Sequence, residues 1–222
     1  MNTHRLCLVH PKDPRTAPVG TVETRLHAVL AALPADFSVL FVGSDRTGDL
    51  VPGVSTPIDV AGRAIDFLPV SRAGRGAFAA ALVRHLPTIR AAARAEVASV
   101  SVHDLTWVPL ARLVGRPIVL VVHHDPRAGA VAGRTSMAAA LRENVALRVA
   151  DRIVGCDAGF VHRCRAGNPA IAAKTELLGL PSGDDAGAAS LFDEDLQIAR
   201  LWERHRRLFD AHPPQRGQHV AA

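Results

Sequence analysis

Short apolar runs alternate with longer segments of helical periodicity along most of the chain. Runs rich in Val, Ile and Leu predict strands that are covered on both faces, because such strands have no polar side to alternate with. Apolar residues that recur every three or four positions predict helices between them. The expected strands are Arg5–Val9, Phe37–Val42, Ile65–Val70, Val100–His103, Ile118–Val122, Arg152–Gly155 and Thr175–Leu180. The expected helices run from Thr21 to Leu33 and over Arg75–Glu96, Leu110–Val114, Ser136–Val149 and Ala158–Arg165.

This alternation is typical of a doubly wound α/β fold with a mostly parallel, Rossmann-like sheet in a single domain. We place that domain at residues 1–185. The composition changes afterwards, where residues 186–211 hold a linker and a C-terminal amphipathic helix over Leu191–Ala211, and the tail 212–222 is expected to be disordered. Within the domain, Thr47–Gly62 reads as a loop with room for one short edge strand, and Pro87 is placed to kink the long helix.

The composition fits a globular protein with one sizeable core. The chain has 222 residues, of which 48% are apolar and 21% charged. Its longest apolar run is far shorter than the roughly 20 residues of a membrane-spanning helix, and its start lacks a secretory apolar region, so we expect a cytoplasmic protein. The three cysteines are widely spaced and form neither a disulfide framework nor a zinc-ligand pattern. The net charge of +5 favours anionic partners without choosing among them.

Five stretches lie at or near the predicted strand ends and carry a family resemblance. They are Gly20–Glu23, Ser101–Asp104, Ile118–His123, Ala150–Asp157 and Lys174–Asp185. In that order they resemble five motifs of the N-terminal, acceptor-side domain of family-4-type glycosyltransferases of the GT-B architecture. These motifs are a Gly-rich turn with an acidic residue, a strand end with His and Asp, an apolar strand that ends in His, an "Ala-Asp-x-Ile" segment, and a hinge.

The resemblance implies transfer of a sugar from a nucleotide sugar to an acceptor, without a required metal or other cofactor. It covers residues 5–185, with departures such as a single Gly in the turn and Ser182 in place of the hinge Asn. Between Asp185 and Ala222 nothing resembles the family's C-terminal donor-binding domain, although Leu191–Phe209 resembles its closing helix. We therefore expect the donor site to come from a partner chain or a homodimer, and the chain alone to have little activity.

The same resemblance marks four substrate-binding candidates, and no catalytic residue is assigned. Gly20 would let its backbone approach a donor phosphate at a helix N-terminus, or it is only a loop glycine. His123 and His103 would position sugar or acceptor hydroxyls, the alternative being buried, hydrogen-bonded imidazoles. Asp104 would bind acceptor hydroxyls or cap the next helix. Neighbouring residues after a strand point to different sides, so we expect no metal site at His123 and the residues after it.

Other functions remain open or are disfavoured. The main alternative is a non-catalytic module derived from a glycosyltransferase that binds a sugar, a phosphate ester or a protein. Nucleic acid is disfavoured, because the sequence lacks a helix-turn-helix, a zinc finger and an aromatic stacking platform. The chain also lacks the glycine fingerprint of dinucleotide binding and the nucleophile elbow of serine hydrolases. Peripheral contact with anionic lipid is a further possibility, through the arginines Arg72, Arg75, Arg84, Arg90, Arg94, Arg142 and Arg148.

Overall fold

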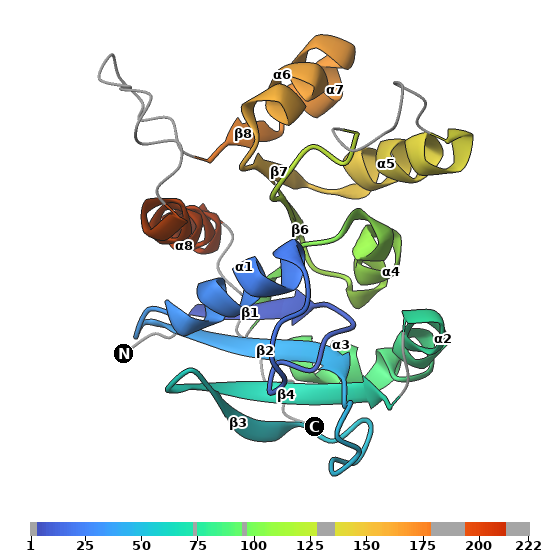
Figure 1. Cartoon of the computed structure of the whole chain (residues 1–222), viewed down its shortest axis with the longest axis vertical. Coiled ribbons are helices and arrows are strands. Elements are labelled where there is room, and N and C mark those ends of the chain that lie inside the picture. Colours follow the sequence, from blue (N-terminus) through green and yellow to red (C-terminus); the bar gives the residue numbers. More distant parts are fainter. Residues whose placement is uncertain (1–3, 73–74, 95–96, 128–135, 179–193, 212–222) are drawn as a thin grey trace, which may run out of the picture.

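One eight-stranded sheet forms the centre of the computed structural model, which describes residues 4–72, 75–94, 97–127, 136–178 and 194–211 (Figure 1). The strand order is β3-β4-β2-β1-β5-β6-β7-β8. All neighbouring strands are parallel except β3, which pairs with β4 as an antiparallel edge strand. The strands are β1 (His4–Val9), β2 (Phe37–Ser44), β3 (Thr56–Val60), β4 (Arg63–Ser71), β5 (Val97–Val102), β6 (Ile118–Val122), β7 (Arg152–Gly155) and β8 (Thr175–Leu177).

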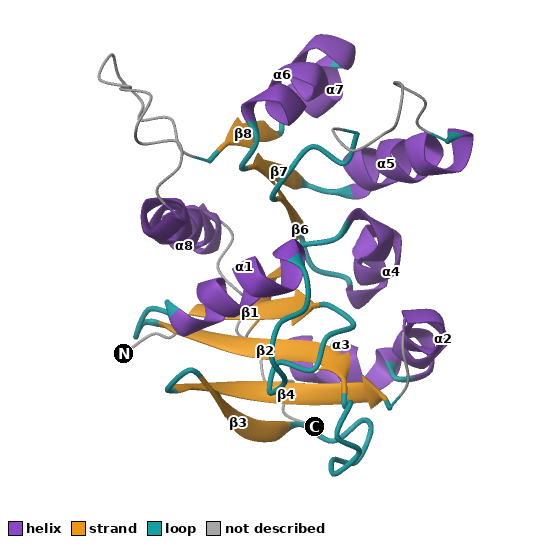
Figure 2. Ribbon diagram, viewed as in Figure 1, coloured by secondary structure: helices purple, strands orange, loops and turns teal. Residues whose placement is uncertain are grey.

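Helices cover both faces of this sheet and leave the central strands buried (Figure 2). Every side chain of β5 and β6 is buried; β6 is apolar throughout, and β5 is apolar except for the small residues Ser99 and Ser101. One face packs on α1 and α8, and the other on α2 to α7. The helices are α1 (Thr21–Ala31), α2 (Arg75–Arg84), α3 (Leu86–Arg94), α4 (Val108–Ala111), α5 (Met137–Val149), α6 (Ala158–Gly167), α7 (Pro169–Ala172) and α8 (Glu194–Ala211).

The sheet has a switch point between β1 and β5. From β1 the chain winds outward through β2 to β4, and it then returns to place β5 on the other side of β1. In doubly wound sheets the loops part at such a point, and ligands bind just outside the carboxyl ends of the strands there. We therefore expect a ligand site at the residues that follow β1, β5 and β6.

The C-terminal helix α8 is anchored on the α1 face far from it in sequence. The indole Nε1 of Trp202 donates to the carbonyl of Val29 at 3.2 Å, and its ring lies 5.0 Å from that of Phe37, centroid to centroid. Arg206 forms an ion pair with Asp36 at the start of β2, with donor–acceptor distances of 2.9 and 3.0 Å. Packing and polar contacts thus hold α8 as part of the same domain.

The predicted fold class and the C-terminal helix are confirmed, while several element boundaries are corrected. The single helix expected over Arg75–Glu96 is two helices that meet at His85, because Pro87 has no N–H to continue the ladder. The helix expected over Leu110–Val114 is instead the end of α4 followed by a 3₁₀ turn. The expected edge strand is β3. The boundary at residue 185 and the tail 212–222 lie outside the described residues, so the domain limits stay predictions.

Candidate functional site

The residues that directly follow four adjacent parallel strands form a polar row at the switch point. They are His10 after β1, His103 after β5, His123 after β6 and Cys156 after β7. The three histidines are buried and Cys156 is partly exposed. Because parallel strands end at one edge of the sheet, the strand order brings together side chains that are up to 146 positions apart (156 minus 10).

Hydrogen bonds link three members of this row, His103, His123 and Cys156. The Nδ1 of His103 lies 2.9 Å from the Nε2 of His123, and the Nε2 of His103 lies 3.2 Å from the hydroxyl of Ser101 on β5. On the other side, the Nδ1 of His123 lies 3.8 Å from the Sγ of Cys156. All four nitrogens of the two imidazoles are thereby engaged. The structure thus brings two of the sequence-predicted residues, His103 and His123, into direct contact.

Burial keeps both imidazoles neutral. It lowers the pKa of His123 to about 3, with a further contribution from the positive charge of Arg25, and it lowers the pKa of His103 well below its ordinary value. Burial also raises the pKa of Cys156 to about 11, so its thiol keeps its proton. With one proton on each ring, the chain has two consistent directions. Protons point either from Ser101 towards Cys156 or the other way, and the row acts as a neutral hydrogen-bonding unit.

A small cavity opens beside this row, between α1, α8 and the ends of β6 and β7. Its volume is about 20 Å³, and its lining includes Arg25, His123, Cys156 and Gln197. That is room for about one water molecule. The guanidinium of Arg25 donates to the carbonyl of His123 at 3.3 Å, so a positive charge lies at the mouth of the site. Arg25 is a site residue that the sequence reasoning missed, because a helical arginine carries no signal of its own.

The N-terminus of α1 lies at the same edge and is opened by Gly20. Gly20 has φ 85° and ψ 165°, and an added Cβ would meet nothing within 4 Å. Because a glycine has no side chain to cap the first turn of α1, the backbone N–H groups of that turn can bind an anion. Glu23 turns back to accept from the N–H of Val19, the residue before the N-cap, at 3.0 Å.

A buried lysine adds positive charge beside this helix end. Lys12 is only 1% exposed, and its Nζ donates to the carbonyl of Glu23 at 3.4 Å. Burial lowers its pKa, an effect that the nearby Glu23 opposes. The chain has two lysines, Lys12 and Lys174, among its 26 basic residues, but this rarity gives no indication of burial or of a role. At the same end, Arg46 reaches Glu23 at 3.6 Å.

Asp104 has a local role in the structure. Its carboxylate accepts from the N–H of Thr106 at 2.9 Å and caps the 3₁₀ turn η1 (Leu105–Trp107). This is the capping alternative that the sequence left open. Its neighbour His103 points into the hydrogen-bonded row instead, as expected for successive residues after a strand.

An ion-pair cluster fixes the loop between β1 and α1. The guanidinium of Arg15 contacts Asp13 at 2.9 Å, Asp45 at 2.7 Å and Asp49 at 2.8 Å. Asp13 and Asp45 are fully buried. Burial raises the pKa of Asp45, but hydrogen bonds from the N–H groups of Leu50 and Gly48 outweigh it and bring the pKa to about 2. The cluster ties this loop to the one after β2 and so sets the path of the chain into Gly20.

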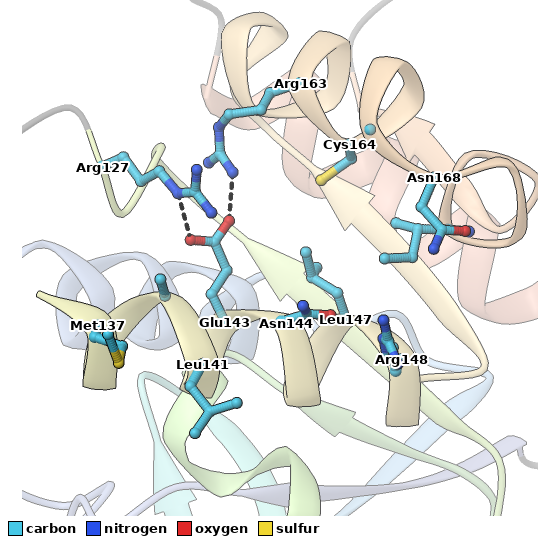
Figure 3. A pocket seen from close by; sticks show the side chains of 13 residues that line it. Arg127, Met137, Leu141, Glu143, Asn144, Leu147, Arg148, Arg163, Cys164 and Asn168 are labelled. Carbon is cyan, nitrogen blue, oxygen red and sulfur yellow. Dashed lines mark hydrogen bonds and ion pairs between the residues drawn. The ribbon is translucent and has the colours of Figure 1, made fainter. Parts of the chain in front are cut away.

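A larger groove lies away from the histidines, between α5 and the pair α6–α7 (Figure 3). Its volume is about 510 Å³. At its centre the buried carboxylate of Glu143 is held by Arg127, at 2.8 Å, and by Arg163. Arg163 also pairs with Asp125. Two arginines and two carboxylates cancel, so this cluster leaves no net charge to attract a ligand, and we place the functional site at the histidine row.

Among the described residues, no three His, Cys, Asp or Glu side chains converge as metal ligands would. None of the described helices is both long enough and apolar enough to span a bilayer.

Known proteins resemble this chain in structure and not in sequence. No family profile matches the sequence, and no curated protein matches it. Sucrose-phosphate synthase from Thermosynechococcus elongatus matches 80% of this chain with a TM-score of 0.56 and 11% identity. The chain has a glycosyltransferase-like fold. It spans 48% of that synthase structure, about half its length. A second structure of the synthase matches 93% of this chain and 99% of its own length, with a TM-score of 0.50 and 13% identity.

Proposed function

We propose that this chain is the acceptor-side half of a family-4-type GT-B glycosyltransferase, which transfers a sugar from a nucleotide sugar to an acceptor. In this proposal the donor half comes from a partner chain or a second copy, and this chain alone turns over little substrate. The observation that carries the proposal is the neutral pair His103–His123 at the switch point of a glycosyltransferase-like sheet.

Each part of the edge has a task in such a reaction. The open helix end at Gly20, with Lys12 beside it, would face the donor diphosphate, because N–H groups and a positive charge stabilise an anion there. His123 would hold a sugar or acceptor hydroxyl through its neutral imidazole, with its Nε2 held by His103 and its Nδ1 exchanging the 3.8 Å contact with the Cys156 thiol for that hydroxyl. A neutral ring can donate or accept a hydrogen bond, whereas an imidazolium can only donate. Arg25 would add positive charge where the leaving group departs.

The second synthase structure supports assigning the N-terminal half. This chain matches 99% of the length of that structure but only 48% of the first one, so the likeness covers one part of the synthase. In this chain a sheet domain is followed by the anchored helix α8. We therefore propose that α8 corresponds to the closing helix of GT-B enzymes, which returns to the N-terminal half.

A thermal-shift panel of UDP-, GDP- and ADP-sugars and of sugar phosphates tests the proposal. A ligand at ten times its Kd adds about 1.4 kcal/mol of stability, which raises the Tm of a domain of this size by about 3 °C. The test variant is Gly20→Ala, which puts a Cβ into the open space at the helix end. The matched control is Gly62→Ala, in the turn between β3 and β4, since Gly62 also has a positive φ, of 77°, and open space around it.

Both alanines should lower the Tm of the free protein, because both put a Cβ on a backbone with positive φ, and Gly20→Ala should lower it more, since φ 85° with ψ 165° is open almost only to glycine. The ligand-induced rise should disappear in Gly20→Ala and persist in Gly62→Ala. A rise that survives in both variants would place the ligand elsewhere. A response to sugar phosphates alone, with no turnover after a donor domain is added, would favour the non-catalytic module.

A further inference from the structure

Helix α5 presents an exposed apolar stripe. Met137 is 89% exposed, Leu141 64% and Val145 39%. Residues four positions apart on a helix lie above one another, so these three side chains form one continuous line on α5. A helix on the surface of a water-soluble domain normally turns such a stripe towards the core and exposes polar side chains. The stripe on α5 is therefore a candidate contact surface.

The charges exposed on the same helix are all positive. Arg142 and Arg148 are exposed, and neither pairs with a carboxylate among the described residues. The only carboxylate of α5 is that of Glu143, which is 3% exposed and enclosed by Arg127 and Arg163 (Figure 3). Glu143 therefore does not offset the arginines at the surface. Towards solvent, α5 offers large apolar side chains and guanidinium groups without a counter-charge.

The surroundings of α5 are also apolar and basic. Met137 and Leu141 lie on the rim of the groove between α5 and α6–α7, and in Figure 3 the side chain of Leu141 points away from the Glu143 cluster. At the other end of α5, Arg148 and Lys174 line a second hollow of about 300 Å³. The apolar stripe thus leads into a basic end, and the whole chain carries a net charge of +5.

Three of the other arginines that the sequence suggested for an anion-binding surface lie apart from such a stripe. Arg84 on α2 is exposed beside one exposed apolar side chain, Val83, and Arg90 on α3 donates to the carbonyl of Leu113 at 2.7 Å. Arg72 donates to the carbonyl of Leu50 at 3.1 Å. The stripe beside the arginines of α5 therefore narrows the contact surface to this helix.

We propose that α5 docks the protein onto a membrane surface that contains anionic phospholipid. The helix lies in the plane of the interface, with Met137, Leu141 and Val145 at the boundary between headgroups and acyl chains and with Arg142 and Arg148 among the phosphates. Charge complementarity selects this occupant, because apolar and cationic groups without an exposed carboxylate match an anionic bilayer. The proposal goes beyond sugar transfer and does not depend on it.

Co-sedimentation of the full chain with large vesicles tests the proposal. Vesicles of phosphatidylcholine alone are compared with vesicles of phosphatidylcholine and phosphatidylglycerol, at low and at high salt. The apolar test variant is Met137→Ser with Leu141→Ser, and its matched control is Val83→Ser with Leu113→Ser, two exposed apolar positions on other helical turns. The charge variant is Arg142→Gln, and its control is Arg84→Gln. All substituted side chains are at least partly exposed, and circular dichroism checks that each variant folds.

The wild type should bind the anionic vesicles more tightly than the neutral ones and should bind less at high salt. The Met137–Leu141 pair should lower the partition coefficient at least about tenfold, and Arg142→Gln about fivefold. Both control variants should bind like the wild type. Equal binding to the two vesicle types, or binding that survives the loss of Met137 and Leu141, would overturn the proposal. A stable dimer that dissociates when Met137 and Leu141 are both replaced would also overturn the proposal, because a second copy of the chain would then cover the stripe.

Discussion

The buried histidines should make the stability of this protein strongly dependent on pH below neutrality. Burial lowers the pKa of His123 to about 3 and that of His205 on α8 to about 4, from an ordinary value of 6.5. The unfolded chain takes up protons at these rings below pH 6.5, while the native protein does not. These rings therefore do not reduce the free energy of unfolding above pH 6.5, and they reduce it progressively as the pH falls from 6.5 towards the native pKa values.

The size of the effect follows from the same values. Each ring that stays neutral in the native state at pH 5 costs about 2 kcal/mol of stability relative to pH 7. His123 and His205 together cost about 4 kcal/mol, and His103 adds to this loss because its pKa is also lowered. A loss of this size is a large part of the 5–15 kcal/mol by which proteins are typically stable.

The informative variant is His205→Phe. The Nδ1 of His205 is buried with no hydrogen-bond partner among the described residues, and its ring packs against Trp202 at 5.9 Å between centroids. A phenyl ring can take its place without losing a hydrogen bond at that atom. Urea unfolding at pH 7, 6 and 5 should show a pH-dependent loss that is smaller than in the wild type by about 2 kcal/mol. His162→Gln, at an exposed position on α6, is the control. An unchanged slope in His205→Phe would refute the reasoning.

Two further predictions concern packing. Trp202→Ala should lower the free energy of unfolding by about 3–5 kcal/mol, because it leaves a cavity between α8 and α1 and removes the hydrogen bond to the carbonyl of Val29. Urea unfolding monitored by circular dichroism measures this loss. A loss below about 1 kcal/mol would mean that α8 is not anchored as described. Gly43→Ala should lower the free energy of unfolding by about 1–3 kcal/mol, since an added Cβ would lie 2.4 Å from the carbonyl oxygen of Lys12. The control Gly76→Ala, in open space on α2, should leave the free energy of unfolding unchanged or raise it in the same assay.

Local patterns predicted the fold well where burial is strong. Ile118–Val122 is apolar throughout and forms β6 with those limits, because both faces of this central parallel strand are covered. The edge strand β3 was harder to place, since Thr56–Val60 alternates between half-buried and exposed residues and contains Pro57. The break between α2 and α3 depends on a single proline, whose effect on a helix ranges from a kink to a full stop.

The candidate site could be predicted only as separate positions. His103 and His123 each follow an apolar strand, so the sequence indicates where their side chains begin. Their contact depends on β5 and β6 being neighbours in the sheet, and the link to Cys156 depends on β7. Lys12 was missed because the fold of the loop after β1 buries it, and no periodicity describes such a loop.

The most direct test of the central claim is to locate the bound ligand. Amide ¹H–¹⁵N spectra of the protein, recorded while a nucleotide sugar from the thermal-shift panel is titrated in, report which backbone groups meet it. The account predicts shifts that saturate together at Gly20–Glu23, at His103 and at His123, which lie at the carboxyl ends of β1, β5 and β6. Shifts confined to the groove between α5 and α6 would contradict the assignment of this edge as the site of sugar transfer.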